Sequence, residues 1–214
     1  MPYIFEVLPP LLRGAYVTLQ VGLAAAFLGI LISFSIGGAS LSKNVIVLFL
    51  LHIFINFFRG TSLLVQLFWI YYVLPFFGLL LSPFVSAVLG IGMNFGAYGS
   101  EIVRGAIVAV PQGQIDAAVA LNMKTSQRML QIVLPQALTR MLAPFGNLLI
   151  ELLKSTALVS LVTLPDLTFQ GFSMMVTLGR RTPILTLVLL IYFLLSFPIS
   201  RVFLWLERRF LVVS

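Results

Sequence analysis

The stretch that decides the fold reads Gly105-Ala-Ile-Val-Ala-Val-Pro-Gln-Gly-Gln-Ile-Asp-Ala-Ala-Val-Ala-Leu-Asn-Met123 and closes with Ile132-Val-Leu-Pro135. It is polar and rich in small helix-forming residues, yet long apolar runs flank it on both sides. The chain as a whole is 60% hydrophobic and only 9% charged, whereas soluble domains carry about 25% charged residues. This composition predicts a membrane protein, and the polar stretch is interpreted as a loop that docks on another protein.

Two further features of the composition exclude whole classes of function. The chain has no cysteine, so a disulfide framework, a CxxC redox or zinc site and a thiol nucleophile are all excluded. The net charge of +7 is scattered between apolar runs rather than clustered, which favours membrane topology over nucleic-acid binding as its explanation. The first residues lack a basic region followed by a small-residue cleavage site, so we expect the first span to act as its own insertion signal.

Apolar runs of about 20 residues, the length of a spanning helix, are separated by charges, prolines and glycines. A shorter apolar run over 45–58, which contains His52 and Asn56, predicts a helix lying at the cytoplasmic interface. We expect bends near Pro75 and Pro144 and a helix start at Pro83. Five spans are predicted, over residues 14–41, 61–81, 83–110, 138–164 and 183–206.

The positions of the 13 basic residues predict the orientation, because Lys and Arg gather in cytoplasmic loops. With the N-terminus outside and the C-terminus inside, Arg13, Arg180 and Arg181 fall outside and Lys154 falls within a span. The other nine are then cytoplasmic: Lys43, Arg59, Arg104, Lys124, Arg128, Arg140, Arg201, Arg208 and Arg209. No repeat or low-complexity tract is visible, so residues 1–214 are expected to form one all-α polytopic domain.

The loop resembles the cytoplasmic EAA loop of bacterial ABC importer permeases, and the preceding Tyr98-Gly-Ser-Glu-Ile-Val-Arg-Gly105 is similar to permeases for polar amino acids. Leu11 to Gln20, Phe58 to Leu67 and Leu206 to Arg209 extend the resemblance over nearly the whole chain, although Ser62 stands where the family usually has Pro. The resemblance implies a type I permease fold in the bacterial cytoplasmic membrane. It also implies a second permease subunit, two ATPase subunits that bind the ATP and Mg, and an external substrate-binding protein.

The resemblance also identifies the residues expected to couple the loop to an ATPase. Asp116 is expected to cap a short helix, and it stands where the family usually has Glu. Asn122 replaces the usual Gly, and Asn is the next best residue for a left-handed turn. An ordinary amphipathic linker is the alternative for the loop taken alone. The predicted coupling residues are Gly113, Gln114, Asp116, Ala117, Ala118, Leu121, Asn122, Met123 and Lys124.

Two pairs of ionisable residues lie in the predicted spans. Glu101 and Arg104 are three residues apart and can pair near the loop, either as a mechanical coupling element or as a plain interfacial ion pair. Glu151 and Lys154 lie at about mid-depth, where charges are costly and usually face a cavity or a partner. We predict that they pair when the pathway is empty, with a buried salt bridge that fixes helix register as the alternative. The predicted substrate pathway comprises Glu151, Lys154, Ser155, Asn147, Asn94, Tyr98 and Gln66, although Asn and Gln in spans more often bridge helices.

No pattern for catalysis or nucleotide binding accompanies these residues. The glycine pairs of the apolar runs lack the Lys-Ser or Lys-Thr of a phosphate loop, and His52 is the single histidine, so the chain is expected to bind no metal and to hydrolyse nothing. The sequence therefore predicts a permease subunit of an ATP-driven importer for polar amino acids or related zwitterions. The alternative is a self-contained secondary carrier or channel, which predicts inverted repeats or acidic relays and leaves the loop unexplained.

Overall fold

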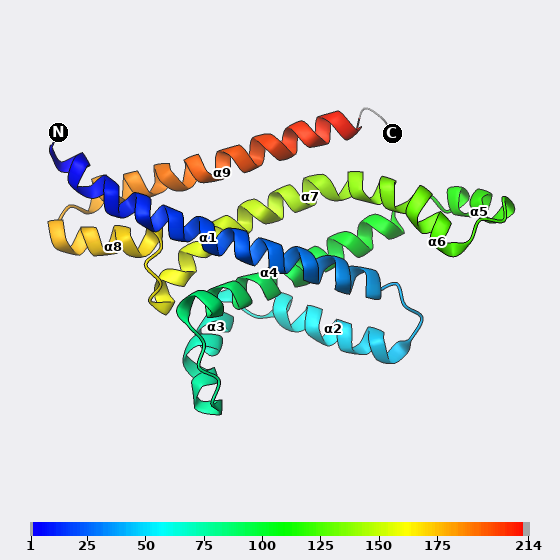
Figure 1. Ribbon diagram of the computed structural model, residues 1–214, viewed down its shortest axis with the longest axis horizontal. Coiled ribbons are helices and arrows are strands. Elements are labelled where there is room, and N and C mark those ends of the chain that lie inside the picture. Colours follow the sequence, from blue (N-terminus) through cyan, green and yellow to red (C-terminus); the bar gives the residue numbers. More distant parts are fainter. Residues whose placement is uncertain (1, 212–214) are drawn as a thin grey trace.

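The computed structural model describes residues 2–211, which form helices joined by short connections and contain no strand. The elements follow one another along the bundle in Figure 1, which confirms the all-α prediction. The α-helices are α1 (Pro2–Ala39), α2 (Val45–Gly60), α3 (Leu63–Phe68), α4 (Pro83–Val108), α5 (Gln112–Ala120), α6 (Thr125–Arg128), α7 (Leu134–Ser155), α8 (Leu167–Leu178) and α9 (Arg181–Leu211). Short π and 3-10 turns complete them: η1 (Trp69–Val73), η2 (Leu74–Phe77), η3 (Met129–Val133) and η4 (Thr156–Val162).

The centre of the molecule is the contact between α1 and α4, which run side by side (Figure 1). Glycines on both helices leave room for the facing side chains. A Cβ on Gly96 would lie 2.4 Å from Cγ2 of Ile32, and one on Gly37 would lie 2.6 Å from Cβ of Val103. Small residues of this kind let helix backbones approach closely in a membrane, where packing replaces the hydrophobic effect as the driving force. Gly29 and Gly37 of α1 thus lie in the close contact, whereas Gly38 has open space beside it.

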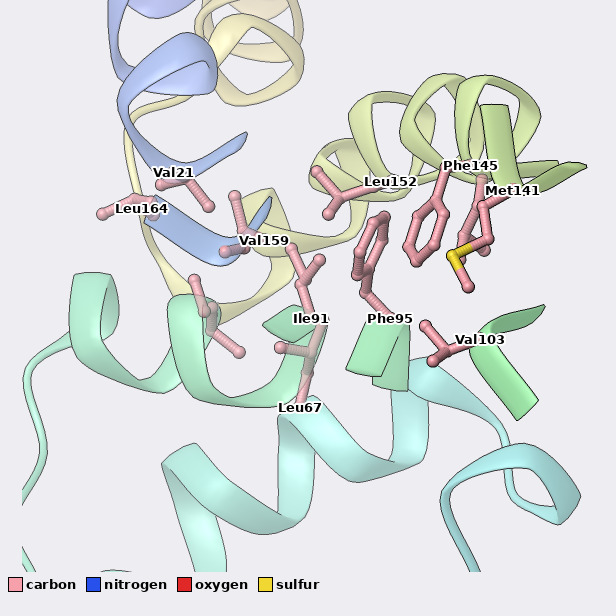
Figure 2. Packing of buried hydrophobic residues seen from close by; sticks show 14 of the residues in the cluster. Val21, Leu67, Ile91, Phe95, Val103, Met141, Phe145, Leu152, Val159 and Leu164 are labelled. Carbon is pink, nitrogen blue, oxygen red and sulfur yellow. The ribbon is translucent and has the colours of Figure 1, made fainter. Parts of the chain in front are cut away.

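A cluster of buried apolar side chains joins α1, α3, α4, α7 and η4. Figure 2 shows Val21 of α1 and Val159 of η4 beside Ile91 of α4, with the rings of Phe95 and Phe145 facing each other between α4 and α7. The centroids of these two rings are 6.2 Å apart. The cluster fixes α4 and α7, the two helices whose ends carry the polar loop.

The region between Val45 and Leu81 is sharply bent. Helix α2 contacts α4 and lies along it (Figure 1), and the chain then bends by 104° into Leu63–Phe77. Only this bent pair together has the length and hydropathy of a span. The break falls at Thr61–Ser62, and η1 and η2 interrupt the second part. An interfacial helix over 45–58 followed by a separate span over 61–81 stays a prediction.

Three described helical segments are long and apolar enough to cross a membrane: Phe5–Ala39, Thr125–Val162 and Arg181–Phe210. The bent pair makes a fourth candidate. Helix α4 falls outside this set, since glycine, serine and asparagine dilute its hydropathy, although it starts at Pro83 behind a Ser82 cap as expected and much of it is buried. The count of five spans and the orientation remain predictions.

Helix α7 runs through Pro144 without ending, and the 3-10 turn η4 continues it to Val162, so no break occurs at this proline.

The next helix, α8, was not predicted from the sequence. Asp166 then caps α8 by accepting hydrogen bonds from the backbone N–H groups of Thr168 and Phe169. Helix α8 lies at the end of the molecule opposite α5 (Figure 1).

Candidate functional site: a polar loop and a charged central cavity

The polar loop folds as a short helix held against the body of the protein. Helix α5 begins directly after Pro111, and α5 contacts η3. The side chain of Arg140 donates to the carbonyl of Ala109, and the amide of Gln136 donates to the side chain of Gln114. These bonds attach the N-terminal part of the loop to α7.

Two details of the loop decide how the predicted coupling residues are placed. Asn122 has a φ of 54°, so the left-handed turn predicted from its replacement of Gly is confirmed. Asp116 lies in the middle of α5 and accepts a hydrogen bond from Gln112 at 3.0 Å, so the prediction that it caps the helix is wrong. The helix starts earlier because Pro111 sets its first turn.

The surface of the loop also differs from the expected one. Ala118 is only 1% exposed and belongs to the inner face of α5. Leu121 is 77% exposed and Val119 is 51% exposed, although both are apolar. Gly113, Gln114, Ala117 and Lys124 are exposed as well, and Met123 is half-buried. An apolar ridge of Val119 and Leu121 at the tip of a polar loop is the feature that a partner protein would cover.

A cavity of about 370 Å³ opens between α2, α4 and α7. Its lining carries a cation, Arg59 at the end of α2, and two carboxylates, Glu101 and Glu151, together with the neutral polar residues Tyr98 and Asn147. A smaller recess shares Tyr98 and Glu151 and adds Asn94 and Ser155. The cavity therefore offers both signs of charge and neutral hydrogen-bonding groups within one space.

Arg59 is held at this place by Tyr98. Its guanidinium carbon lies 5.2 Å from the centre of the Tyr98 ring, and the Tyr98 hydroxyl donates to the Arg59 carbonyl at 3.4 Å. Tyr98 lies ten residues before the end of α4, or about 15 Å from the loop end at 1.5 Å per residue. Arg59 is exposed and faces this cavity rather than the polar loop, and its predicted cytoplasmic location stays a prediction.

Gln66 and Asn94 close the break between α2 and α3. The amide nitrogens of both donate to the carbonyl of Phe58, at 2.9 and 2.8 Å, and Asn94 also donates to the side-chain oxygen of Gln66 at 3.3 Å. These bonds satisfy a helix end that is withdrawn from water. Gln66 is buried and outside the cavity linings given above, so it has the bridging role that was the alternative, while Asn94 combines bridging with lining.

Lys154 points away from this cavity. It lines a second cavity, of about 420 Å³, between α7 and α9, with Tyr192, Ser196 and Ser200 as its polar neighbours. Within the described residues, Lys154 and Glu151 form no ion pair with each other or with another side chain. The structure thus shows the two side chains lining different cavities, and their pairing stays a prediction.

The other predicted pair is present. Nη2 of Arg104 lies 2.8 Å from Oε2 of Glu101, and Nε donates to Oε1 at 3.3 Å. Glu101 of this pair also lines the central cavity. Its role in coupling stays a prediction.

A buried polar cluster at the opposite end was missed by the sequence analysis. Asp166 is fully buried, and its Oδ2 accepts a hydrogen bond from the Tyr192 hydroxyl of α9 at 3.4 Å. Thr168 of α8 shares a hydrogen bond of 2.8 Å with the same hydroxyl, and Thr18 of α1 accepts from the N–H of Leu167. The signal was the Pro165-Asp166 step, which is typical of a helix start. The cluster ties α1, α8 and α9 together.

The described residues hold no group of three or more His, Cys, Asp or Glu side chains that could bind a metal ion. His52 lies on α2 away from the cavity linings described above. The cavity residues offer charges and neutral hydrogen-bonding groups.

Comparison with known proteins assigns the chain to a family. Residues 13–212 match the model of the binding-protein-dependent transport system inner membrane component. The chain belongs to this family. It is 47% identical to the probable amino-acid ABC transporter permease protein y4tF of Sinorhizobium fredii, over 91% of this chain and 84% of that protein. It is 34% identical to the glutamine transport system permease protein GlnP of Escherichia coli, over 96% and 95%.

Solved structures show the same fold. A crystal structure of an amino acid ABC transporter with histidines superposes with a TM-score of 0.91 at 31% identity, over 97% of both chains. The inward-facing MetNI methionine ABC transporter superposes with a TM-score of 0.80 at 20% identity, over 96% of this chain and 98% of that chain. The resemblance read from the loop and its flanks is confirmed, and the chain is a membrane-embedded, multi-pass permease subunit with the fold of type I ABC importers.

Proposed function

We propose that this permease subunit forms half of the pathway of an ATP-driven importer for polar amino acids in the bacterial cytoplasmic membrane. The relatives named as amino-acid permeases support the class of solute. In this proposal two ATPase subunits bind ATP and Mg, a second permease subunit completes the pathway, and a binding protein delivers the solute from outside. The observation that carries the proposal is the central cavity, which holds Arg59 and Glu151 in one space.

The charges of the cavity match those of an amino acid. A zwitterion buried in a low-dielectric space needs a partner for its carboxylate and one for its ammonium, because an unpaired buried charge is costly. Arg59 is the partner for the carboxylate, since a guanidinium can bind both oxygens. Glu151 is the partner for the ammonium, and Asn94, Tyr98, Asn147 and Ser155 supply neutral contacts. This assignment replaces Lys154 by Arg59 as the cation of the site.

Coupling to ATP hydrolysis uses the loop. Closure of the ATPase subunits presses on α5, and the bonds of Arg140 and Gln136 transmit the displacement to α7. Helix α7 carries Glu151, so its movement changes the cavity that holds the solute. Glu101 and Arg104 lie between the loop and the cavity, and in the proposal their ion pair keeps α4 in step with the loop. A difference in solute affinity between the two positions of α7 supplies the coupling.

The test pairs each charged residue with the group it is proposed to bind. In the reconstituted importer, Glu151→Gln should weaken binding of the amino acid by about tenfold to a hundredfold, the effect of losing one charged hydrogen-bond partner. The same variant should bind the deaminated analogue of the solute as wild type does. Arg59→Gln should show the reverse selectivity, with normal binding of the α-amide. Equal losses of affinity for the solute and for both analogues would contradict the assignment. Arg201→Gln on α9 is the matched control.

A further inference from the structure

We propose that Lys154 pairs with Glu151 of a second copy of this chain, so that two reciprocal ion pairs join the permease subunits at mid-depth. The inference concerns the interface between subunits. It rests on the proposed function only in that Glu151 is shared with the solute. It starts from a cation that lacks a counter-charge at a depth where one is needed.

The depth of Lys154 follows from the cavity that it lines. Ser196 of that lining lies fifteen residues after Arg181, near the middle of the candidate span Arg181–Phe210. At 1.5 Å per residue it is about 22 Å from either end of that span. The rest of the lining is largely apolar, with Ile150, Leu189, Phe193 and Phe197 around the ammonium. An isolated ammonium at this depth is costly and usually pairs with an anionic or polar group.

The chain itself offers few candidates for that partner, because it contains only six acidic residues. Asp166 is buried in its own hydrogen bonds, Asp116 bonds to Gln112 in the loop, and Glu101 pairs with Arg104. Glu6 lies near the start of α1 and Glu207 near the end of α9. Glu151 is left, at the same depth, exposed and without an ion pair among the described side chains.

The structure shows no ion pair between these two side chains within one chain, and a two-fold contact allows one between two chains. Glu151 faces the cavity between α2, α4 and α7, and Lys154 faces the cavity between α7 and α9. Both side chains are exposed in the isolated subunit, and they leave α7 one turn apart. An isologous two-fold contact places residue i against j and j against i. If the axis passes beside α7, each Lys154 meets the Glu151 of the other copy, and the same contact forms two ion pairs.

The shared glutamate links assembly to transport. In the empty state Glu151 binds the partner's lysine, and an arriving ammonium group competes for the same carboxylate. Loading of the cavity then loosens the contact along α7, the helix that the loop moves. The pair predicted from the sequence within one chain is in this account formed across the interface.

Charge reversal in two differently tagged copies tests the pairing. A copy with Glu151→Lys carries two cations at these positions, and a copy with Lys154→Glu carries two anions. Each should fail to associate with itself, because like charges are then opposed. Mixed together, they should co-purify in preference to like pairs by about tenfold or more, since both ion pairs are restored with reversed polarity. Arg201→Glu on α9 is the matched control and should show no preference.

The outcomes separate this proposal from the proposed function. Mixed pairing shows that both variants fold, and it is read without solute or ATP. Self-association of either variant at the wild-type level, or the absence of preference in the mixture, would overturn the proposal. Failure of two differently tagged wild-type copies to co-purify would also overturn it, because another protein would then be the second permease subunit. None of these results bears on whether Glu151 binds an amino acid, which the analogue experiment decides separately.

Discussion

The carboxylate of Asp166 has hydrogen-bond partners, yet its charged form destabilises the folded state. Burial raises the pKa of Asp166 to about 6, and the hydrogen bonds from the N–H groups of Phe169 and Thr168 and from Tyr192 offset only part of that rise. At pH values between the pKa of Asp166 in the unfolded chain and its pKa in the folded protein, the folded protein binds the Asp166 proton more tightly than the unfolded chain does. Stability from this group therefore increases as the pH falls from about 7 toward 4.

Asp166→Asn isolates this effect, because Asn also caps helices well and stays neutral. Above pH 6 the variant should be more stable than the wild type by up to roughly 3 kcal/mol, the value of a shift of about two pKa units. The difference should disappear near pH 4. Thermal unfolding in nanodiscs at several pH values measures it. A wild-type protein that gains stability relative to the variant as the pH rises would show that the carboxylate is needed in its charged form.

At the scale of elements, the close contact of α1 with α4 depends on glycines, which have no side chain. A Cβ on Gly99 would lie 2.0 Å from Oγ of Ser33, whereas one on Gly38 meets nothing within 4 Å. Gly99→Ala should therefore destabilise the permease by about 1–3 kcal/mol through overpacking. Gly38→Ala, the matched control, should be neutral or slightly stabilising in its helix. Thermal unfolding compares the two, and equal behaviour would argue against a close contact of these helices.

Helix α5 supports a prediction about docking. Leu121→Asp places a charge on the exposed apolar ridge without disturbing the inner face of the loop, whereas Ala118→Asp would bury a charge inside the subunit itself. We expect Leu121→Asp to weaken co-elution with the ATPase subunits by about tenfold or more, because the charge is desolvated without a partner. Membrane insertion should be unchanged. Gln112→Asp at the exposed start of α5 is the control, and normal ATPase binding by Leu121→Asp would remove the ridge from the interface.

These elements also show what the sequence could and could not predict. Asn122 and Pro83 were placed correctly because their backbone preferences are local and strong. Hydropathy measures length and apolarity but not direction, so the 104° bend after α2 and its contact with α4 could not be predicted. The central cavity was only partly predicted: Arg59 was counted as a loop cation, since nothing in Phe58-Arg59-Gly60 shows that Tyr98 lies beneath it. For the same reason the sequence did not show that Lys154 lines a cavity between α7 and α9.

At the scale of the whole molecule, the fold separates three tasks along one axis. The loop that carries α5 lies at one end, the cavity with Arg59 and Glu151 lies in the middle, and the cluster around Asp166 holds α1, α8 and α9 at the other (Figure 1). Helix α7 runs between the loop and the cavity and is attached to both. In the proposed function this arrangement turns a push on the loop into a change of the cavity.

The central claim is that this chain transports an amino acid only when an ATPase drives it. The most direct measurement is uptake of labelled amino acid into proteoliposomes that contain the purified permease with its ATPase subunits and binding protein. We expect uptake that requires ATP, stops with a non-hydrolysable analogue, and is abolished when the permease carries Leu121→Asp. Uptake that the permease alone sustains on an ion gradient, without ATP or an ATPase, would contradict the account and favour a secondary carrier.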